Sequence, residues 1–343
     1  MPLFSPSTLK ITIPKSNPVS RGLLYFFLTL VIFTVTAELV ARSPLGSRLP
    51  APSVRAESFL FDAKVYQLEQ QVRNDGGIDC IFIGSSVTNS DIDPEIIERT
   101  YRELTGETIR CFNFGYPAMT IDNADAFLKA VNDKFHPRLI IYTFLPRDLT
   151  DVTYTVDFLE RSPWFETESF TPAGWLTNHS YAYRYFQTWR YLLLPPNRAK
   201  RLLEIENLTA KGFQPTFDIR EPYPEKINLT EESLEEVWQT ERPRAGLEQL
   251  LTNGKDVSIL LIEAPIFHEP GADSLWRVYE TVYIPALEAL AQNAGVTYIR
   301  SQEVAVGIPR EHWYDHLHFN FDGAETFSQW LGTVLADHSV LLD

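Results

Sequence analysis

Residues 80–86 read Cys-Ile-Phe-Ile-Gly-Ser-Ser, an apolar run that ends in a glycine and two serines. A run of this length is typical of a strand that is buried on both faces of a parallel sheet. A glycine and a serine at the carboxyl end of such a strand allow a sharp turn that exposes a hydroxyl group. Taken alone, however, Gly-Ser-Ser is more often ordinary turn chemistry. The flanking sequence must therefore decide what this turn does.

Strands and helices alternate around this run. A helix is predicted after Asp93, the expected N-cap, with Pro94 in its first turn and Gly106 as its stop. Further strands are predicted over residues 109–115, 139–145, 257–264 and 296–300, and further helices over about 122–135, 244–253, 274–293 and 322–336. This order predicts an α/β fold with a five-stranded, parallel, doubly wound sheet of the flavodoxin-like kind. Functional groups are expected at the carboxyl ends of its strands.

Residues 151–240 interrupt the alternation and are interpreted as a mostly helical insertion. The aromatic stretch 180–194 places Tyr181, Tyr185, Phe186, Trp189, Leu192 and Leu193 at helical spacing. Core packing is the favoured interpretation of this stretch, and a membrane-surface face or a wall that binds an acyl chain or sugar stays open. Because long insertions near a site shape its pocket, we expect substrate choice to reside here.

The N-terminal part predicts a membrane anchor. Residues 1–21 form a basic segment, and residues 22–37 carry no charge; extended to residue 41, this transmembrane anchor (22–41) includes the single acid Glu38. About 20 helical residues span a bilayer core. A signal peptide cleaved after Ala37 is the competing interpretation. Basic residues flank the run on both sides and do not fix its orientation. Residues 42–56 read as a linker, and residues 57–343 as the folded domain.

Composition restricts the partners of this domain. A formal net charge of −15 over 343 residues excludes a nucleic-acid partner, which requires a basic face. The only two cysteines, Cys80 and Cys111, each stand four residues before a glycine and are expected at similar depth in neighbouring strands. A disulfide between them is conceivable, but two buried free thiols are the favoured prediction.

A second motif stands near the C-terminus, where residues 313–323 read WYDHLHFNFDG. A serine becomes a good nucleophile only when a base takes its proton, and a carboxylate must fix the tautomer of that base. Asp315 and His318 supply both groups from one loop before the last helix. Together with a serine at the end of the first strand, this Asp-x-x-His predicts a catalytic triad.

Two other interpretations concern the histidines. His312, Asp315, His316 and His318 form a possible metal cluster, but all would come from one loop and no HExxH or CxxC accompanies them, so neither a metal nor a cofactor is expected. His316 alternates with His318 and is expected to point away from the site. His268 follows the fourth predicted strand and is interpreted as a surface loop residue rather than as part of the cleft.

These blocks resemble the SGNH/GDSL hydrolase superfamily over residues 78–150 and 256–336. The resemblance implies that Ser86 is the nucleophile, that Asp315 and His318 are its partners, and that the backbone N–H of Gly115 contributes to the oxyanion hole. Ser85 replaces the usual aspartate of Gly-Asp-Ser. Gly-Ser-Ser is similar to a membrane-anchored branch that includes the teichoic-acid D-alanyl transfer protein and to polysaccharide O-acetyltransferase or esterase domains.

One departure concerns the third block of the family, which is usually Gly-x-Asn-Asp. Here the third predicted strand runs into Pro146-Arg147-Asp148, so Arg147 stands near the place of the asparagine. An arginine can stabilise an oxyanion or bind a substrate carboxylate or phosphate. A structural ion pair between Arg147 and Asp148 is the alternative, and the sequence favours neither.

The sequence therefore predicts a membrane-anchored serine esterase or O-acyltransferase that acts on an acylated envelope glycan or a similar ester. Its domain is expected on the extracytoplasmic side of the cell membrane, with a membrane-bound acyl-transfer partner left open. The alternative is a catalytically inactive SGNH domain that serves as a membrane-bound partner in envelope assembly; the place of Arg147 favours it, and the complete set of Ser86, Asp315 and His318 disfavours it.

Overall fold

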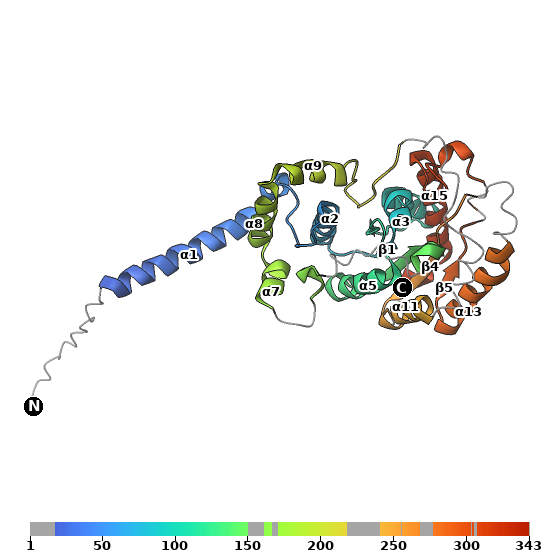
Figure 1. Cartoon of the computed structure of the whole chain (residues 1–343), viewed down its shortest axis with the longest axis horizontal. Helices are drawn as coiled ribbons and strands as arrows, with labels where there is room; N and C mark the ends of the chain where they lie inside the picture. Colours follow the sequence, from blue (N-terminus) through green and yellow to red (C-terminus); the bar gives the residue numbers. More distant parts are fainter. Residues whose placement is uncertain are drawn as a thin grey trace, which may run out of the picture.

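The computed structural model describes residues 18–149, 161–166, 171–217, 241–254, 256–267, 277–302, 304 and 307–342. Its five strands are β1 (Cys80–Gly84), β2 (Cys111–Asn113), β3 (Leu139–Phe144), β4 (Ser258–Glu263) and β5 (Thr297–Ile299). All are parallel, in the order β2-β1-β3-β4-β5. The predicted sheet is therefore confirmed, with each strand shorter than or equal to its predicted range. Figure 1 shows the sheet surrounded by helices at one end of an elongated molecule.

Alternate residues of the strands contribute to two separate hydrophobic cores. Ile81 and Ile83 of β1 belong to the core on one face, with helices α2 (Phe59–Asp75), α5 (Ile121–Phe135), α11 (Glu241–Asn253) and α13 (Ile284–Ala294). Cys80 and Phe82 belong to the core on the other face, with α4 (Pro94–Thr105) and α15 (Phe321–Asp337). Because side chains alternate along a strand, both faces of the sheet are buried, as a doubly wound fold requires.

Local signals place the helices around the sheet. Asp93 caps α4 by accepting a hydrogen bond from the Glu95 N–H at 2.9 Å, Pro94 opens the helix, and Gly106 ends it in a left-handed conformation (φ 77°). The predicted long helix over 274–293 is in part a π-helix, η4 (Tyr279–Tyr283), which continues into α13. The short 3-10 segments are η1 (Gly46–Arg48), η2 (Pro146–Leu149), η3 (Pro163–Phe165), η5 (Arg310–His312) and η6 (Ser339–Leu342).

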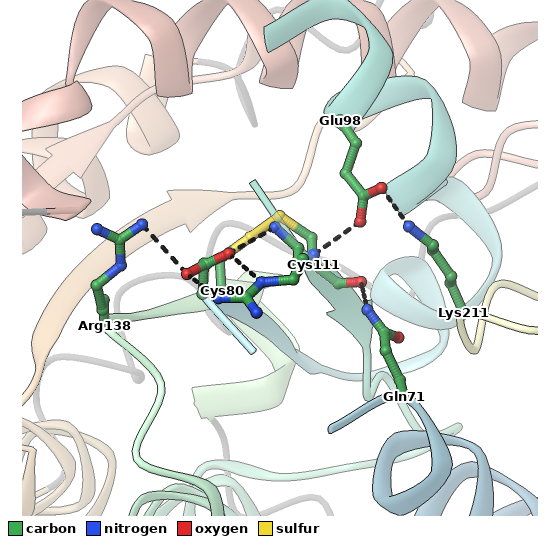
Figure 2. Close-up of a disulfide and its surroundings, with 8 residues drawn as sticks. Gln71, Cys80, Glu98, Cys111, Arg138 and Lys211 are labelled. Carbon is green, nitrogen blue, oxygen red and sulfur yellow. Dashed lines mark hydrogen bonds and ion pairs between the residues drawn. A yellow bond between two sulfur atoms is a disulfide. The ribbon is translucent and has the colours of Figure 1, made fainter. Parts of the chain in front are cut away.

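The prediction of free thiols is wrong, because Cys80 and Cys111 form a disulfide. The two residues are register partners on the neighbouring parallel strands β1 and β2, with Cα atoms 4.6 Å apart. Figure 2 shows the disulfide within a polar surround: Gln71 donates to the Cys111 carbonyl, and Glu98 accepts from the Cys111 N–H while it pairs with Lys211. Register, which a single sequence does not reveal, decided this outcome.

The described part of the insertion is helical, as predicted, with α7 (Pro172–His179), α8 (Tyr181–Leu192) and α9 (Pro195–Glu204). Core packing of its aromatic stretch is confirmed for only half of the residues. Tyr181, Tyr185 and Leu192 are buried, whereas Phe186, Trp189 and Leu193 are exposed. Buried Arg184 fixes α8 to α2 through a two-pronged ion pair with Glu69, at 2.6 and 3.0 Å.

Helix α1 (Pro18–Arg42) extends from the domain as a single long rod (Figure 1). Its segment Arg21–Arg42 is long and apolar enough to cross a membrane, and its apolar side chains are exposed. Only the C-terminal end of α1 contacts the domain, where Ala41 packs with Tyr181 and Tyr185. Length and composition therefore agree with the predicted anchor, although a signal sequence would meet the same test.

Candidate active site

The sharp turn after β1 presents Ser86 at the start of α3 (Ser86–Asp91). Gly84 makes the turn possible: a Cβ at this position would lie 2.1 Å from both the Thr143 carbonyl oxygen and the Thr88 hydroxyl. No side chain can be tolerated at such a distance, so β1, β3 and α3 approach closely only because residue 84 is glycine. Ser86 stays partly exposed at the first helical position.

A short hairpin-like loop carries Asp315 and His318 to this serine. An antiparallel bridge between Trp313 and Phe319 closes the loop, and the Tyr314 N–H donates to the His318 carbonyl at 2.9 Å. His318 Nε2 lies 2.7 Å from Ser86 Oγ, while its Nδ1 lies 2.9 and 3.0 Å from the two carboxylate oxygens of Asp315. These contacts have the connectivity of a nucleophile, a base and an orienting carboxylate.

The electrostatics of Asp315 suit the orienting role. Burial raises the pKa of this carboxyl group, but the hydrogen bond and charge of His318 and the backbone N–H groups of Leu317 and His318 lower it, to about 2 overall. Both N–H groups donate to Oδ1, at 2.8 and 2.9 Å. Asp315 is therefore a carboxylate at neutral pH and can stabilise a protonated His318.

Asp91 is a further buried residue at this site that the sequence reasoning did not single out. It lies at the end of α3 and accepts a hydrogen bond from the Phe319 N–H at 3.1 Å, which connects the helix that carries Ser86 to the residue after His318. Burial raises the pKa of Asp91 well above its usual value, and the charge of Asp315 raises it further. Its position five residues after Ser86 in the same helix was the only available signal.

Ser85 and Asp148 connect the ends of β1 and β3 beside Ser86. Buried Ser85 donates its hydroxyl to Asp148 Oδ2 at 2.7 Å, and the same oxygen accepts the Leu145 N–H at 2.9 Å. Ser85 therefore has a structural role in the turn. Arg147 lies in η2 directly after β3, but its side chain lies outside the described part of the structure. Its proposed role stays a prediction.

Gly115 lies beside α3, but its N–H is engaged within its own loop. It donates to Asn113 Oδ1 at 2.8 Å, and the Gly115 carbonyl accepts from the buried Lys64 ammonium at 2.6 Å. A Cβ on Gly115 would lie 2.3 Å from the Asn89 nitrogen, so this glycine permits close packing of the loop on α3. This geometry speaks against Gly115 as the oxyanion donor that the family resemblance implied.

The next turn offers another backbone donor at the same end of the sheet. The Tyr116 N–H donates to the Gly84 carbonyl at 2.9 Å, and the Met119 N–H closes the turn onto the Tyr116 carbonyl at 3.1 Å. Exposed Ala118 within this turn has a left-handed backbone (φ 62°), which is sparsely populated for residues other than glycine. Among the described residues, no hydrogen-bond acceptor is found for the Ala118 N–H.

The histidines interpreted as possible metal ligands are separated by the fold. His318 is directed to Ser86, whereas His316 is buried and its carbonyl accepts the Phe267 N–H at 2.9 Å. The described residues contain no group of three or more His, Cys, Asp or Glu side chains that could hold a metal. His268 lies outside the described residues.

The insertion reaches the rim of this site through residues 209–217. The Gln214 N–H donates to the Asn89 carbonyl at 3.0 Å, and the Asn89 side chain returns a 3.1 Å hydrogen bond to the Gln214 side chain. Phe217 then stacks on Phe321, the first residue of α15, with ring centroids 5.6 Å apart. Both rings are exposed, and Phe321 stands three residues after His318 in the sequence.

Comparison with known proteins identifies structural relatives only. No protein-family model and no curated protein matches the chain. Among solved structures, it is similar to a lipase/acylhydrolase from Enterococcus faecalis (15% identity, 76% of this chain and 97% of that chain, TM-score 0.37). It is also similar to an alpha/beta hydrolase from the metagenome of Lake Arreo, Spain (14%, 78% and 97%, 0.39). A further similar structure is an acetylxylan esterase from Geobacillus stearothermophilus (13%, 76% and 94%, 0.38).

Proposed function

We propose that this protein is a membrane-anchored SGNH-type serine esterase or O-acyltransferase. The observation that carries the proposal is the 2.7 Å contact between Ser86 Oγ and His318 Nε2, combined with Asp315 at the Nδ1 of the same ring. A hydroxyl, a base and a carboxylate in hydrogen-bond sequence are the arrangement required for acyl transfer through a covalent intermediate.

In the proposed reaction, Ser86 Oγ attacks the ester carbonyl carbon while its proton passes to His318 Nε2. Asp315 keeps the other ring nitrogen protonated and stabilises the imidazolium. The tetrahedral intermediate collapses when the ester C–O bond breaks, and the departing alkoxide takes the proton from His318. Water or a glycan hydroxyl then attacks the acyl-serine by the same route in reverse, and Ser86 regains its proton.

Backbone N–H groups are proposed to hold the negative oxygen of the intermediate. The Ser86 N–H is at the first position of α3, where a helix provides no internal acceptor. Ala118, in the exposed turn after β2, offers a second N–H in place of the engaged Gly115. Arg147, in the segment after β3, stays a candidate for a third contact or for binding a substrate anion.

The proposed location is the cell membrane, with the domain on its extracytoplasmic side. Helix α1 has the length and composition of a membrane span. The Cys80–Cys111 disulfide supports the extracytoplasmic side, because disulfides persist mainly in oxidising compartments. Carbonate extraction and N-terminal sequencing test the anchor: a soluble mature protein that begins at Glu38 would show instead that residues 1–37 are a signal peptide.

A fluorophosphonate probe tests the chemistry directly. The wild-type chain is expected to be labelled on the peptide that contains Ser86, and Ser86→Ala is expected to abolish labelling. Ser85→Ala is the matched control, since its neighbouring hydroxyl is engaged with Asp148, and it should still be labelled. If the folded wild-type protein does not react, the alternative gains support: an inactive SGNH domain that acts as a membrane-bound partner in envelope assembly. The engaged Gly115 N–H favours that alternative.

The proposed substrate is an ester that lies close to the membrane. An acylated envelope glycan or a similar ester near the membrane fits the anchor and the exposed Phe217–Phe321 pair, because aromatic rings offer flat apolar surface to a ligand. Transfer from a membrane-bound acyl donor protein is proposed as the alternative to hydrolysis by water. Neither a nucleic acid nor a cofactor has a part in this reaction.

A further inference from the structure

Helix α8 has two faces of different character. One face is buried against the domain, and the opposite face presents Phe186, Trp189, Arg190 and Leu193, which follow the helical spacing i, i+3, i+4, i+7. The exposed fractions of Phe186, Trp189 and Leu193 are 62%, 51% and 70%. Single exposed apolar residues are common, but a continuous row on one helix face marks an interaction surface. These four residues are called the outer stripe of α8.

The outer stripe lies beside the point where α1 meets the domain. Glu38, the residue directly after the uncharged run 22–37, caps the N-terminus of α8: it accepts hydrogen bonds from Ser180 Oγ at 2.8 Å and from the Tyr181 and Ala182 N–H groups at 3.0 Å. Arg42 adds a hydrogen bond to the His179 carbonyl at 2.7 Å. Figure 1 shows α8 at the domain end of α1.

These contacts explain the single acid of the predicted span. Glu38 has an intramolecular role at the end of the apolar run, because it accepts hydrogen bonds from the first turn of α8 and from Arg42. The first turn of α8 is thus held where α1 leaves the hydrocarbon core. The head-group layer is roughly 5–8 Å thick on each side of a bilayer. A helix held at this depth adjoins that layer.

A basic cleft adjoins the same helix. It has a volume of about 660 Å³ and is lined by Arg55, Arg161 and Arg190, together with Tyr191, Leu194 and the acid Glu57. Within the described part of the chain, none of the three guanidinium groups forms an ion pair. Arginine is well suited to bind phosphate, because its planar donors match the oxygen geometry.

The charge of this region is opposite to that of the whole chain. Residues 186–204, which follow the buried Arg184, contain four basic residues and one acid, Glu204, whereas the chain carries a formal net charge of −15. The backbone at the cleft is also strained, since Arg55 and Glu57 have left-handed conformations (φ 68° and 55°). Such conformations persist only when the surrounding structure enforces them. A local basic surface on an acidic protein, next to a membrane span, is complementary to anionic lipid.

We propose that the outer stripe of α8 and the arginine cleft form one bilayer-contact surface. Phe186, Trp189 and Leu193 enter the head-group region of the membrane that α1 spans, and the guanidinium groups of the cleft bind lipid phosphates. This contact fixes the orientation of the domain relative to the membrane. The proposal relies on α1 as a membrane span, and is independent of whether Ser86 is catalytic.

Spin labels in the full-length chain test this surface. The protein is incorporated into nanodiscs that contain anionic and zwitterionic phospholipids, with a nitroxide on Leu193→Cys. The matched control is Leu104→Cys, an exposed leucine (57%) in α4 on the sheet domain. The native cysteines are paired with each other and do not take the label. Collision of the nitroxide with oxygen and with an aqueous nickel chelate reports whether each position lies in lipid or in water.

The label on residue 193 is expected to be oxygen-accessible and protected from nickel, and the label on residue 104 to show the opposite. Arg161→Gln and Arg190→Gln should each shift the ratio of embedded to aqueous label about fivefold towards water in anionic discs, and little in neutral discs. Thermal melting confirms that these surface variants are folded. Equal, aqueous signals at both positions in anionic discs would overturn the contact, and failure of the chain to enter discs would overturn the span itself.

Discussion

His318 Nε2 lies 2.7 Å from Ser86 Oγ, although 232 sequence positions separate the two residues. The parallel sheet creates this proximity. Ser86 follows β1, an internal strand that lies between β2 and β3, and the Trp313–Phe319 bridge directs the His318 loop to the same end of the sheet. The hydrogen bond from Phe319 to Asp91 then joins that loop to α3 itself. The relative positions of His318 and Ser86 are thus set by contacts on both sides of the pair.

Because the three residues form one hydrogen-bonded unit, their substitutions are expected to be non-additive. Ser86→Ala and His318→Ala should each remove most ester turnover, by roughly 10⁴-fold or more, and the double variant should be little worse. Asp315→Asn should cost as much as either or less. Steady-state kinetics on a small aryl ester measures this. If Ser85→Ala abolishes activity while Ser86→Ala retains it, the assignment of Ser86 as the nucleophile is wrong.

The disulfide is expected to contribute stability through the unfolded state. Cys80 and Cys111 are separated by 31 positions, so their bond closes a loop whose entropy is worth about 3–4 kcal/mol in the chain-entropy description. The double variant Cys80→Ser/Cys111→Ser should therefore unfold at lower denaturant concentration than wild type. A reductant should lower the unfolding midpoint of wild type but leave the double variant unchanged. If reductant has no effect on wild type, the two cysteines are not paired.

The sequence predicted the elements well because their signals are local. The apolar run 80–84, the caps at Asp93 and Gly106 and the Asp315-x-x-His318 motif all depend on residues near each other in the chain. The wrong prediction of free thiols has its physical origin in a contact between distant segments. The pairing of Cys80 with Cys111, 31 positions apart, depends on the register of two strands. Register leaves no periodic or compositional signal in a single sequence.

The division of α8 into two faces illustrates the same limit. Helical spacing placed Tyr181, Tyr185 and Leu192 together with Phe186 and Trp189 as one aromatic stretch, but spacing alone cannot say which face meets the domain. The ion pair of Arg184 with Glu69 decides it, because it turns the Arg184 side of the helix inward. The opposite face is exposed as a consequence.

Glu263 is expected to make stability depend on pH. Burial raises its pKa to about 8, although its hydrogen bond with Tyr298 opposes the shift; the unfolded value is near 4.5. The folded state thus keeps a proton that the unfolded state releases above pH 4.5. The stability of the wild type should fall by about 1.4 kcal/mol per pH unit from this group as pH rises from about 5 to 8.

Glu263→Gln removes this titration, so the variant should match the wild type near pH 5 and exceed it in unfolding free energy at pH 8. Urea denaturation at both pH values measures the difference. Glu107→Gln, at an exposed position, is the control and should leave the pH dependence unchanged. Parallel pH profiles for wild type and Glu263→Gln would mean that Glu263 is already ionised in the folded protein.

The aromatic pair at the rim of the site is expected to act on large substrates only. Phe217 comes from the insertion and stacks on Phe321, which follows the His318 loop, so the pair can contact a substrate beyond its ester group without contacting the reacting atoms. Phe217→Ala should therefore change kcat/KM for a small aryl acetate by less than about threefold. For an acylated oligosaccharide it should lower kcat/KM by roughly tenfold, mainly through KM, since an aromatic contact contributes about 1 kcal/mol or more.

Phe186→Ala, which removes a similarly exposed ring from α8, is the matched control. In detergent solution it should leave kcat/KM for both substrates unchanged. If Phe217→Ala lowers kcat/KM equally for the small and the large ester, Phe217 acts through the catalytic residues and not through substrate binding.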